Sequence, residues 1–188
     1  MVKAPAPSDV NSGLTSCDWR VLKALFGMPR DVLGSECQEV TNAELRSLCG
    51  VVQVGQFRIY GNVVMLSELQ KGLSACYVKE PSLWNQLGTA GCMCARLVRG
   101  SDSTPSNHSW GTALDFTVGG RLDVRGDGYC QRGVLRLYDF LHPLGFFWGG
   151  GYRTTEDAMH YELATETVLR LALAGRWGEA VRLRAVKI

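Results

Sequence analysis

The sequence predicts an α+β fold in a single domain. Its 188 residues are enough to bury one sizeable hydrophobic core. Short strand-like and helix-like segments are mixed along the chain without the regular rhythm of parallel βαβ units, and no linker composition divides them. Residues 1–13 are rich in Pro, Ser, Gly and Ala, which predicts a flexible tail. We therefore expect one domain over residues 14–188, with a helical N-terminal portion over residues 14–50.

The first half of the chain predicts helices separated by short strands. Ser16 is placed to cap a helix in which apolar residues recur at near-helical spacing until Gly27. A capping-box pattern, Thr41 followed by Glu44, opens a second short helix that stops at Gly50. The remaining expected elements are a strand over 57–61, a helix over 64–76, a brief helix over 81–87 and a strand over 91–97.

The second half predicts three strands and two longer helices. The β-prone run 114–118 is bounded by two glycines, and an apolar strand over 146–148 runs into a glycine turn. Residues 160–163 are the third expected strand. Helical patterns cover 134–141 and 165–176. The basic stretch 176–187 is expected to be a solvated helix face or tail.

Composition and charge exclude several classes of protein. Hydrophobic residues make up 46% and charged residues 20% of the chain, as in ordinary soluble domains. The net charge of +2 is too small, and too evenly spread, to predict nucleic-acid binding. No stretch has the length of a membrane span, and the N-terminus lacks the apolar run of a secretory signal. We expect a monomer that is made in the cytoplasm and is not inserted into a membrane.

Seven cysteines are many for this length. Because the chain is expected to begin in a reducing compartment, free thiols are the default prediction. Cys92-Met93-Cys94 resembles half of a structural zinc site, but a zinc pair usually leaves two or more residues between its cysteines, and no second pair follows. An apolar strand with small buried thiols is the better interpretation.

The three histidines are the first candidates for catalytic or metal-binding residues. A hydrolytic zinc needs three His or carboxylate ligands, an open position for water, and a nearby carboxylate to take the proton from that water. His108, Asp115 and His160 would supply the ligands, and Asp157 the base. Spacing alone is weak support, because a histidine and an aspartate seven residues apart also fit a capped turn followed by a strand. His142, next to a proline in an apolar segment, is expected to be structural.

Two longer strings strengthen the metal prediction. Ser106 to Asp115 reads SNHSWGTALD, which resembles the signature S-x-H-x-x-G-x-A-x-D, and Glu156 to Glu162 reads EDAMHYE, an acid two residues before a histidine. Both motifs, in this order, are similar to the zinc peptidase family of D-alanyl-D-alanine carboxypeptidases and L-alanyl-D-glutamate endopeptidases. The resemblance spans roughly residues 55–163. It implies a Zn²⁺ site formed by His108, Asp115 and His160, a catalytic base at Asp157, and a small antiparallel sheet that holds the zinc between flanking helices.

The resemblance also implies an arginine upstream of the first motif, facing the substrate. Arg96 is the expected residue and Arg99 the alternative, since a guanidinium stays charged and stabilises an oxyanion without giving up a proton. Ser106 and Trp110 are further candidates for substrate contact, although a core position explains the tryptophan equally well. Glu156 is the rival base, but on an extended chain its side chain points away from that of Asp157.

The function implied by the resemblance is hydrolysis of a peptide bond in bacterial peptidoglycan. An aspartate base favours the L-alanyl-D-glutamate endopeptidase branch over the D,D-carboxypeptidase branch. With no signal sequence, the expected setting is a phage endolysin that reaches the cell wall or periplasm after release and lyses the host cell. The alternative from a different class is a non-catalytic binding module that keeps the zinc for stability. The presence of Asp157 favours catalysis, because a structural metal needs no base.

Overall fold

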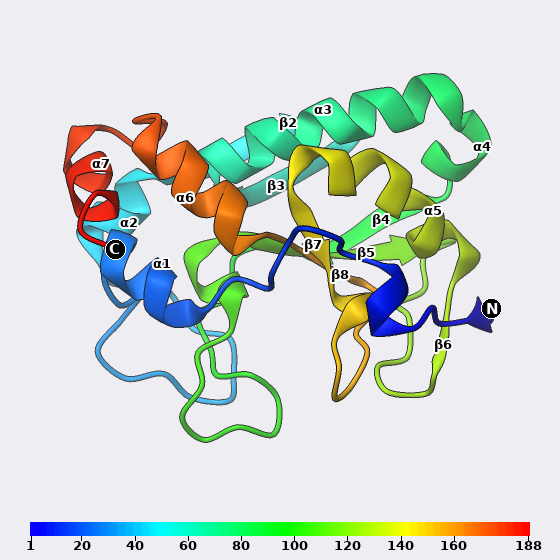
Figure 1. Cartoon of the computed structure of the whole chain (residues 1–188), viewed down its shortest axis with the longest axis horizontal. Coiled ribbons are helices and arrows are strands. Elements are labelled where there is room, and N and C mark those ends of the chain that lie inside the picture. Colours follow the sequence, from blue (N-terminus) through cyan, green and yellow to red (C-terminus); the bar gives the residue numbers. More distant parts are fainter.

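Four antiparallel strands form the central sheet, in the order β4–β5–β8–β7, in a computed structural model that describes residues 1–188 (Figure 1). The strands are β4 (Leu87–Gly91), β5 (Ala113–Val118), β7 (Phe146–Trp148) and β8 (His160–Leu163). β5 and β8 are the inner strands, so each is paired on both sides. This arrangement is the α+β fold with a small antiparallel sheet that the sequence predicts.

Strand alternation gives the sheet one apolar face and one polar face. Leu114, Phe116 and Tyr161 are buried against the helices, and the hydroxyl of Tyr161 donates to the Val134 carbonyl at 2.7 Å. Because successive side chains on a strand point to opposite faces, Asp115, His160 and their neighbours project to the other side. That second face is where the polar residues of the two motifs meet.

The helices cover the apolar face and one end of the sheet. Figure 1 shows α3, α5 and α6 above the strands, and the loops near residues 30–40, 98–106, 120–128 and 152–158 below them. The helices are α1 (Trp19–Phe26), α2 (Ala43–Ser47), α3 (Val63–Lys79), α4 (Pro81–Trp84), α5 (Arg132–Leu141), α6 (Thr165–Leu173) and α7 (Glu179–Ala185). Four 3₁₀ turns complete them: η1 (Pro7–Asp9), η2 (Asn107–Trp110), η3 (His142–Leu144) and η4 (Gly149–Gly151). None of the helices combines the length and apolar character needed to span a bilayer.

Two antiparallel strand pairs lie outside the central sheet. β2 (Cys49–Val54) pairs with β3 (Phe57–Asn62), and the N-terminal strand β1 (Val2–Lys3) pairs with β6 (Tyr129–Cys130). Within residues 1–13, Asn11 is buried and exchanges two hydrogen bonds with the backbone of Trp148, both 2.9 Å long. The segment predicted as a flexible tail therefore lies against the domain in the structure.

Three local expectations are wrong. Asn42, not Thr41, caps α2, because its side chain accepts a hydrogen bond from the Leu45 amide at 3.0 Å. The strand expected over residues 91–97 is displaced: β4 ends at Gly91, and Ala95 and Leu97 form only isolated bridges. Asp18, not Ser16, caps α1 by accepting a hydrogen bond from the Arg20 amide at 2.8 Å. Ser16 does not cap the helix because its hydroxyl donates to Glu162 instead, at 2.6 Å.

Candidate metal centre

The polar face brings Asp115 and His160 together because β5 and β8 are paired at these two residues. His108 comes from the 3₁₀ turn η2, and Gly111 follows this turn in a left-handed conformation with φ of +65°. A Cβ atom at position 111 would lie 2.7 Å from the backbone nitrogen of Asn62, so only glycine fits there. The tight turn returns the chain directly into β5.

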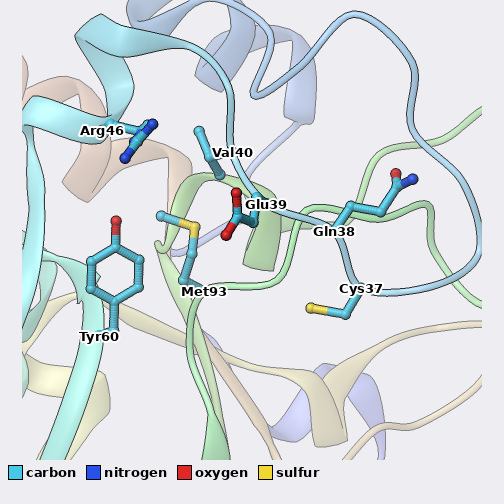
Figure 2. Close-up of a pocket in the computed structure, with 7 residues that line it drawn as sticks. All are labelled: Cys37, Gln38, Glu39, Val40, Arg46, Tyr60 and Met93. Atoms are coloured by element: carbon cyan, nitrogen blue, oxygen red, sulfur yellow. The ribbon is translucent and has the colours of Figure 1, made fainter.

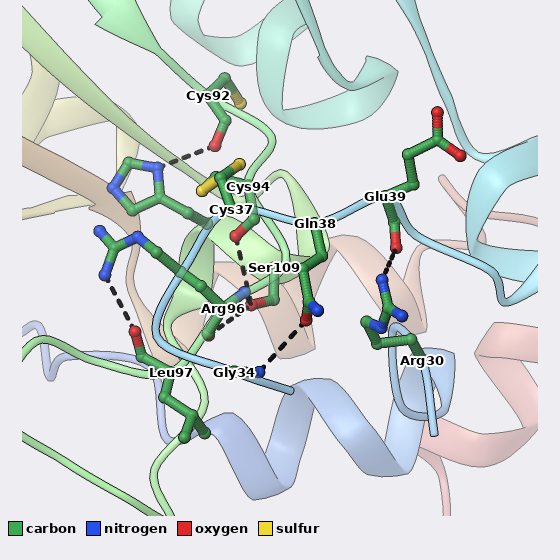
Figure 3. The surroundings of a disulfide bond; sticks show 11 residues. Arg30, Gly34, Cys37, Gln38, Glu39, Cys92, Cys94, Arg96, Leu97 and Ser109 are labelled. Atoms are coloured by element: carbon green, nitrogen blue, oxygen red, sulfur yellow. Dashed lines mark hydrogen bonds between the residues drawn. A yellow bond between two sulfur atoms is a disulfide. The ribbon is translucent and has the colours of Figure 1, made fainter. Parts of the chain in front are cut away.

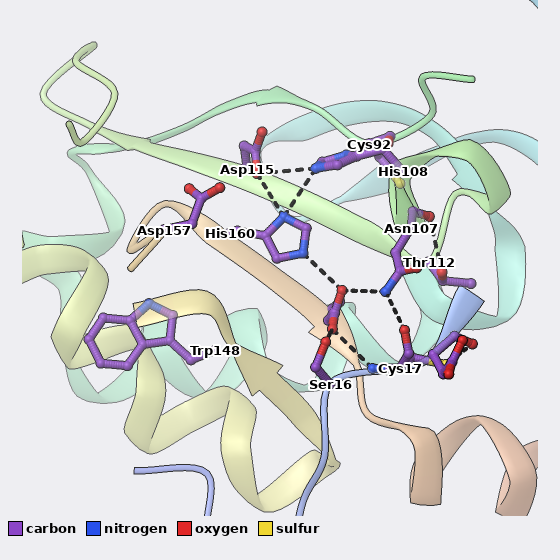
Figure 4. A network of polar contacts seen from close by, with 12 residues as sticks. Ser16, Cys17, Cys92, Asn107, His108, Thr112, Asp115, Trp148, Asp157 and His160 are labelled. Carbon is purple, nitrogen blue, oxygen red and sulfur yellow. Dashed lines mark hydrogen bonds and ion pairs between the residues drawn. The ribbon is translucent and has the colours of Figure 1, made fainter. Parts of the chain in front are cut away.

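Three ligand atoms form a nearly equilateral triangle (Figure 4). The distances between His108 Nε2, Asp115 Oδ1 and His160 Nδ1 are all 3.2 Å. Zinc bonds of about 2.0–2.1 Å at a tetrahedral angle place ligand atoms roughly 3.3 Å apart. The donor set and its spacing therefore fit a tetrahedral Zn²⁺ with one position left open.

The second nitrogen of each imidazole has its own partner. His108 Nδ1 lies 2.8 Å from the Cys92 carbonyl oxygen, and His160 Nε2 lies 3.0 Å from Glu162 Oε2. Because a carbonyl oxygen and a carboxylate only accept hydrogen bonds, the ring N–H groups point to them, which directs His108 Nε2 and His160 Nδ1 toward the triangle. Such outer partners fix the tautomer and orientation of metal-binding histidines.

The charges around the triangle favour a cation. Burial raises the pKa of Asp115, but hydrogen bonds from His108 and His160 more than offset this and hold its pKa well below the usual range. Burial lowers the pKa of His160, yet its hydrogen bonds to Asp115 and Glu162 raise it to about 10 overall. These contacts favour the protonated form of His160 in the metal-free protein, and a metal ion bound at Nδ1 would take the place of that proton.

Asp157 lies beside this triangle, on the loop that joins η4 to β8 (Figure 4). The Asp157 amide donates to the Gly149 carbonyl at 2.9 Å, and a Cβ atom at Gly149 would lie 2.5 Å from the Asp157 carbonyl oxygen. Asp157 Oδ1 is buried and has no hydrogen-bond partner. An unpaired buried carboxylate oxygen next to a metal-binding cluster is suited to accept a proton from a bound water.

The rival base, Glu156, is engaged elsewhere. Its Oε1 accepts a hydrogen bond from the Gly128 amide at 2.9 Å, and its carbonyl oxygen accepts one from Gly126 at 3.0 Å. These bonds join the 120–128 loop to the 152–158 loop. The same contact brings Arg125 to Asp157, with Arg125 Nε 3.5 Å from Asp157 Oδ2. Nothing in the local sequence around Arg125 predicts this ion pair.

Arg96 is half-buried near the same cluster. Burial is the main cause that lowers its pKa, and the charges of Asp115 and Asp157 act in the opposite direction, which places these carboxylates within its electrostatic range. Its backbone is held by Ser109, whose hydroxyl contacts both the amide and the carbonyl oxygen of Arg96 at 3.0 Å. Arg96 Nη1 donates to the Leu97 carbonyl at 3.0 Å.

The other predicted substrate residues are either buried in the domain or exposed on a loop. Trp110 is fully buried, and its indole N–H donates to the Gly27 carbonyl at 2.8 Å, so it packs in the core and lines no cleft. Ser106 is also buried, with its amide bonded to the Arg96 carbonyl at 3.0 Å. Arg99 is exposed, on the loop after Arg96. His142 bonds to the Ser12 carbonyl at 3.1 Å, away from the metal ligands, as expected of a structural histidine.

Glu162 is the main residue that sequence reasoning missed. It lies two positions after His160 on β8, so both side chains are on the polar face, and it is 1% exposed. Although burial raises its pKa, hydrogen bonds from His160, Ser16 and Asn107 lower it, which keeps the carboxylate ionised. The signal was present in the sequence, since strand alternation alone places residues 160 and 162 on one face.

The expectation that all cysteines are reduced is also wrong. Cys37 and Cys94 form a disulfide that ties the 28–42 loop to the segment before η2 (Figure 3). Cys94 is linked to the metal centre by its amide, which donates to the His108 carbonyl at 3.0 Å. The Cys92 thiol is buried and contacts the Gly111 carbonyl at 3.3 Å, in agreement with a packing role.

Two cavities adjoin this region. One of about 430 Å³ lies between the 37–40 segment and β3 (Figure 2) and is lined by Cys37, Gln38, Glu39, Val40, Arg46, Tyr60 and Met93. A second, of about 380 Å³, is lined by Arg58, Ile59, Tyr60, Thr89, Ala90, Gly91, Cys92 and Met93. The second reaches the metal centre only through Cys92, whose carbonyl oxygen contacts His108. Neither cavity is lined by a metal-ligand candidate.

Comparison with known proteins finds a similarity in the segment that carries the candidate metal ligands. A family model described as D-alanyl-D-alanine carboxypeptidase matches residues 99–163. The matched segment contains His108, Asp115, Asp157 and His160 and ends at the last residue of β8. No curated protein shows a significant match to the chain. The segment that carries the candidate ligands is therefore similar to a peptidase family, while residues 1–98 and 164–188 lie outside the match.

Proposed function

We propose that this protein is a zinc-dependent peptidase that hydrolyses a peptide bond in the stem peptides or cross-links of bacterial peptidoglycan. The main support for this proposal is the position of Asp157. Its Oδ1 is buried and unpaired, and it lies beside the His–Asp–His triangle, whose ligand atoms are 3.2 Å apart. A metal that only stabilised the fold would need no such free carboxylate. The match of residues 99–163 to the carboxypeptidase family supports the choice of substrate.

The residues around the triangle have separate tasks in this proposal. When bound, zinc lowers the pKa of a water molecule and polarises the substrate carbonyl. Asp157 Oδ1 accepts the proton of the attacking water and passes it to the leaving amine. Arg96, the cation within range of Asp115 and Asp157, binds the developing oxyanion or a substrate carboxylate. Arg125 holds Asp157 Oδ2, which leaves Oδ1 free for proton transfer.

Within this class we favour an L-alanyl-D-glutamate endopeptidase that acts as a phage endolysin. The aspartate at position 157 supports the endopeptidase branch over the carboxypeptidase branch. Disulfides persist outside the reducing cytoplasm, and peptidoglycan also lies outside it. The Cys37–Cys94 disulfide therefore supports action in that compartment. We expect the enzyme to act as a monomer on the wall, without inserting into the membrane.

Digestion of purified peptidoglycan tests the proposal. The protein is incubated with sacculi of several cross-link chemotypes, with zinc or with a chelator, and the released peptides are identified by mass spectrometry. A new N-terminal D-glutamate identifies the endopeptidase, and loss of a terminal D-alanine identifies the carboxypeptidase. His108→Ala, which removes a ligand, is expected to be inactive. His142→Ala is the matched control, because His142 contacts only the Ser12 carbonyl and a tyrosine ring.

The same experiment separates the alternatives. A protein that binds zinc and sediments with sacculi but releases no peptide from any chemotype is a binding module, and the peptidase proposal fails. The endolysin setting is tested by production of the protein in a bacterial host with and without a pore that opens the inner membrane. Lysis that requires the pore supports release to the wall, and no lysis in either case contradicts it.

A further inference from the structure

The buried carboxylate of Glu162 connects the metal centre to the N-terminal segment. Its Oε2 accepts hydrogen bonds from His160 Nε2 at 3.0 Å and from Asn107 Nδ2 at 2.6 Å. Its Oε1 accepts from the Ser16 hydroxyl at 2.6 Å and from the Cys17 amide at 3.1 Å. All four donors converge on the Glu162 carboxylate, and Figure 4 labels the four donor residues. Because each oxygen accepts two hydrogen bonds, the carboxylate is held in one orientation.

Ser16 and Cys17 are themselves fixed by contacts with residues of the motif region. Asn107 Nδ2 donates to the Cys17 carbonyl at 2.8 Å in addition to its bond with Glu162. The Thr165 hydroxyl donates to the Ser16 carbonyl at 3.1 Å. Residues 15–17 thus run across the end of β8 and complete the hydrogen-bond network. They lie outside the segment that matches the peptidase family.

The orientation of His160 depends on this network. Its ring must turn Nδ1 toward His108 and Asp115, and it does so because Nε2 is held by Glu162. We propose that Ser16 is a positioning residue of the metal centre: its hydroxyl, together with Asn107, holds the Glu162 carboxylate in the place that aims His160 Nδ1 at the metal. The N-terminal segment is then a part of the metal site. This inference rests on the metal-binding part of the proposed function.

The neighbouring residue provides a matched control. Thr15 also donates its hydroxyl to a glutamate, Glu166 Oε1, at 2.8 Å, but this contact is exposed and leads to α6 instead of to a histidine. Thr15→Ala and Ser16→Ala therefore remove equivalent hydroxyl–carboxylate bonds from adjacent residues, and only one of these bonds reaches the metal. Ser16→Thr keeps the hydroxyl and serves as the rescue variant.

Zinc affinity is the direct measurement, made by competition with a chromophoric chelator and without any substrate. Loss of the group that directly holds a metal-binding histidine typically weakens metal binding 10- to 100-fold, and Ser16 acts one contact further out, through Glu162, so its effect should lie at the lower end of that range. We expect Ser16→Ala to weaken zinc binding about tenfold and to change the visible absorption of the Co²⁺-substituted protein. Thr15→Ala and Ser16→Thr should stay within twofold of the unmodified protein. Asn107→Ala, which removes the donor to the other carboxylate oxygen, should repeat the Ser16→Ala effect.

The outcomes separate positioning from general stability. Thermal melting of each metal-free variant shows whether it folds. If Ser16→Ala does not fold, the zinc affinity of Asn107→Ala tests the network instead. Equal zinc affinity and an unchanged Co²⁺ spectrum in Ser16→Ala and Thr15→Ala overturn the proposal. An unmodified protein that binds no zinc overturns it as well, together with the peptidase assignment. An unmodified protein that binds zinc but releases no wall peptides overturns only the peptidase assignment.

Discussion

Asp115 and His160 face each other across β5 and β8 as direct register partners, with Asp115 Oδ1 3.2 Å from His160 Nδ1. Two ligands on paired strands are held more rigidly than two on loops, since the backbone hydrogen bonds of the sheet fix their spacing. His108 enters from a turn whose residues are tied to β5 by a glycine that no other residue replaces without strain. Two of the three candidate ligands thus lie on paired strands, and the proposed base, Asp157, is on an adjoining loop.

Replacing Asp157 should separate metal binding from catalysis. Asp157→Ala is expected to retain zinc, because Asp157 is not a member of the ligand triangle. Removal of a general base should lower turnover of wall peptides about 10²- to 10⁴-fold. Zinc content is measured by elemental analysis and turnover by peptide release. Glu156→Ala is the control and should keep near-normal turnover, since Glu156 is bonded to Gly128. Equal loss in both variants would contradict the assignment of the base.

Arg125 should set the acidic side of the pH–rate profile. Burial raises the pKa of Asp157, and the Arg125 guanidinium acts against this rise. Asp157 must be unprotonated to accept a proton, so the rate falls as the pH drops through its pKa. Arg125→Ala removes the opposing cation, and the acidic limb should move to higher pH. Profiles of the rate against pH check this. Arg153→Ala, on the same loop as Asp157 and exposed, should leave the limb in place.

Zinc affinity should rise with pH because the metal competes with a proton on His160. In the metal-free protein the pKa of His160 is raised from 6.5 to about 10 by Asp115 and Glu162, despite burial. Zinc binding at Nδ1 releases that proton, so the apparent affinity should increase up to about tenfold per pH unit below this pKa. Chelator competition between pH 6.5 and 9 measures the slope. A flat dependence would show that His160 is already neutral.

The stability of the metal-free protein should change in the opposite direction. A raised pKa means that the folded state binds the proton more tightly than the unfolded state. This contribution is complete below the unfolded value of 6.5 and is lost as the pH rises through about 10. Thermal melts of chelator-treated protein should therefore show a lower melting temperature at pH 9 than at pH 6. His160→Gln, which removes the titrating group, should reduce that difference.

The disulfide should contribute measurably to stability. Cys37 and Cys94 are 57 positions apart, and closing a loop of that size stabilises a fold by about 4 kcal/mol in the chain-entropy treatment. Cys37→Ser, or addition of a reductant, should lower the free energy of unfolding in urea by up to this amount. Cys49→Ser, at an unpaired cysteine, should not reproduce the effect. Thiol titration of the unfolded protein gives the count: five free thiols before reduction and seven after.

Most secondary structure of the second half could be predicted from local patterns. The strands 114–118, 146–148 and 160–163 lie within one residue of β5, β7 and β8, because β-prone runs are bounded there by glycines and a polar loop. The strand expected over 91–97 does not form, since its apolar residues are buried by loop contacts and not by sheet pairing. Trp110 could not be placed either, because a large aromatic side chain fits a cleft wall or a core equally well by sequence.

The sequence by itself determined which residues are candidates, since each motif is local: residue types at fixed spacing single out His108, Asp115 and His160 as candidate ligands and Asp157 as the proposed base. Only the tertiary structure decided what surrounds them. Ser16 and Glu162 are 146 positions apart, and Arg125 and Asp157 meet only where two loops join. Such contacts depend on the path of the whole chain, and no local pattern encodes them. The candidate ligands can therefore be read from the motifs, whereas the network that orients them is a property of the fold.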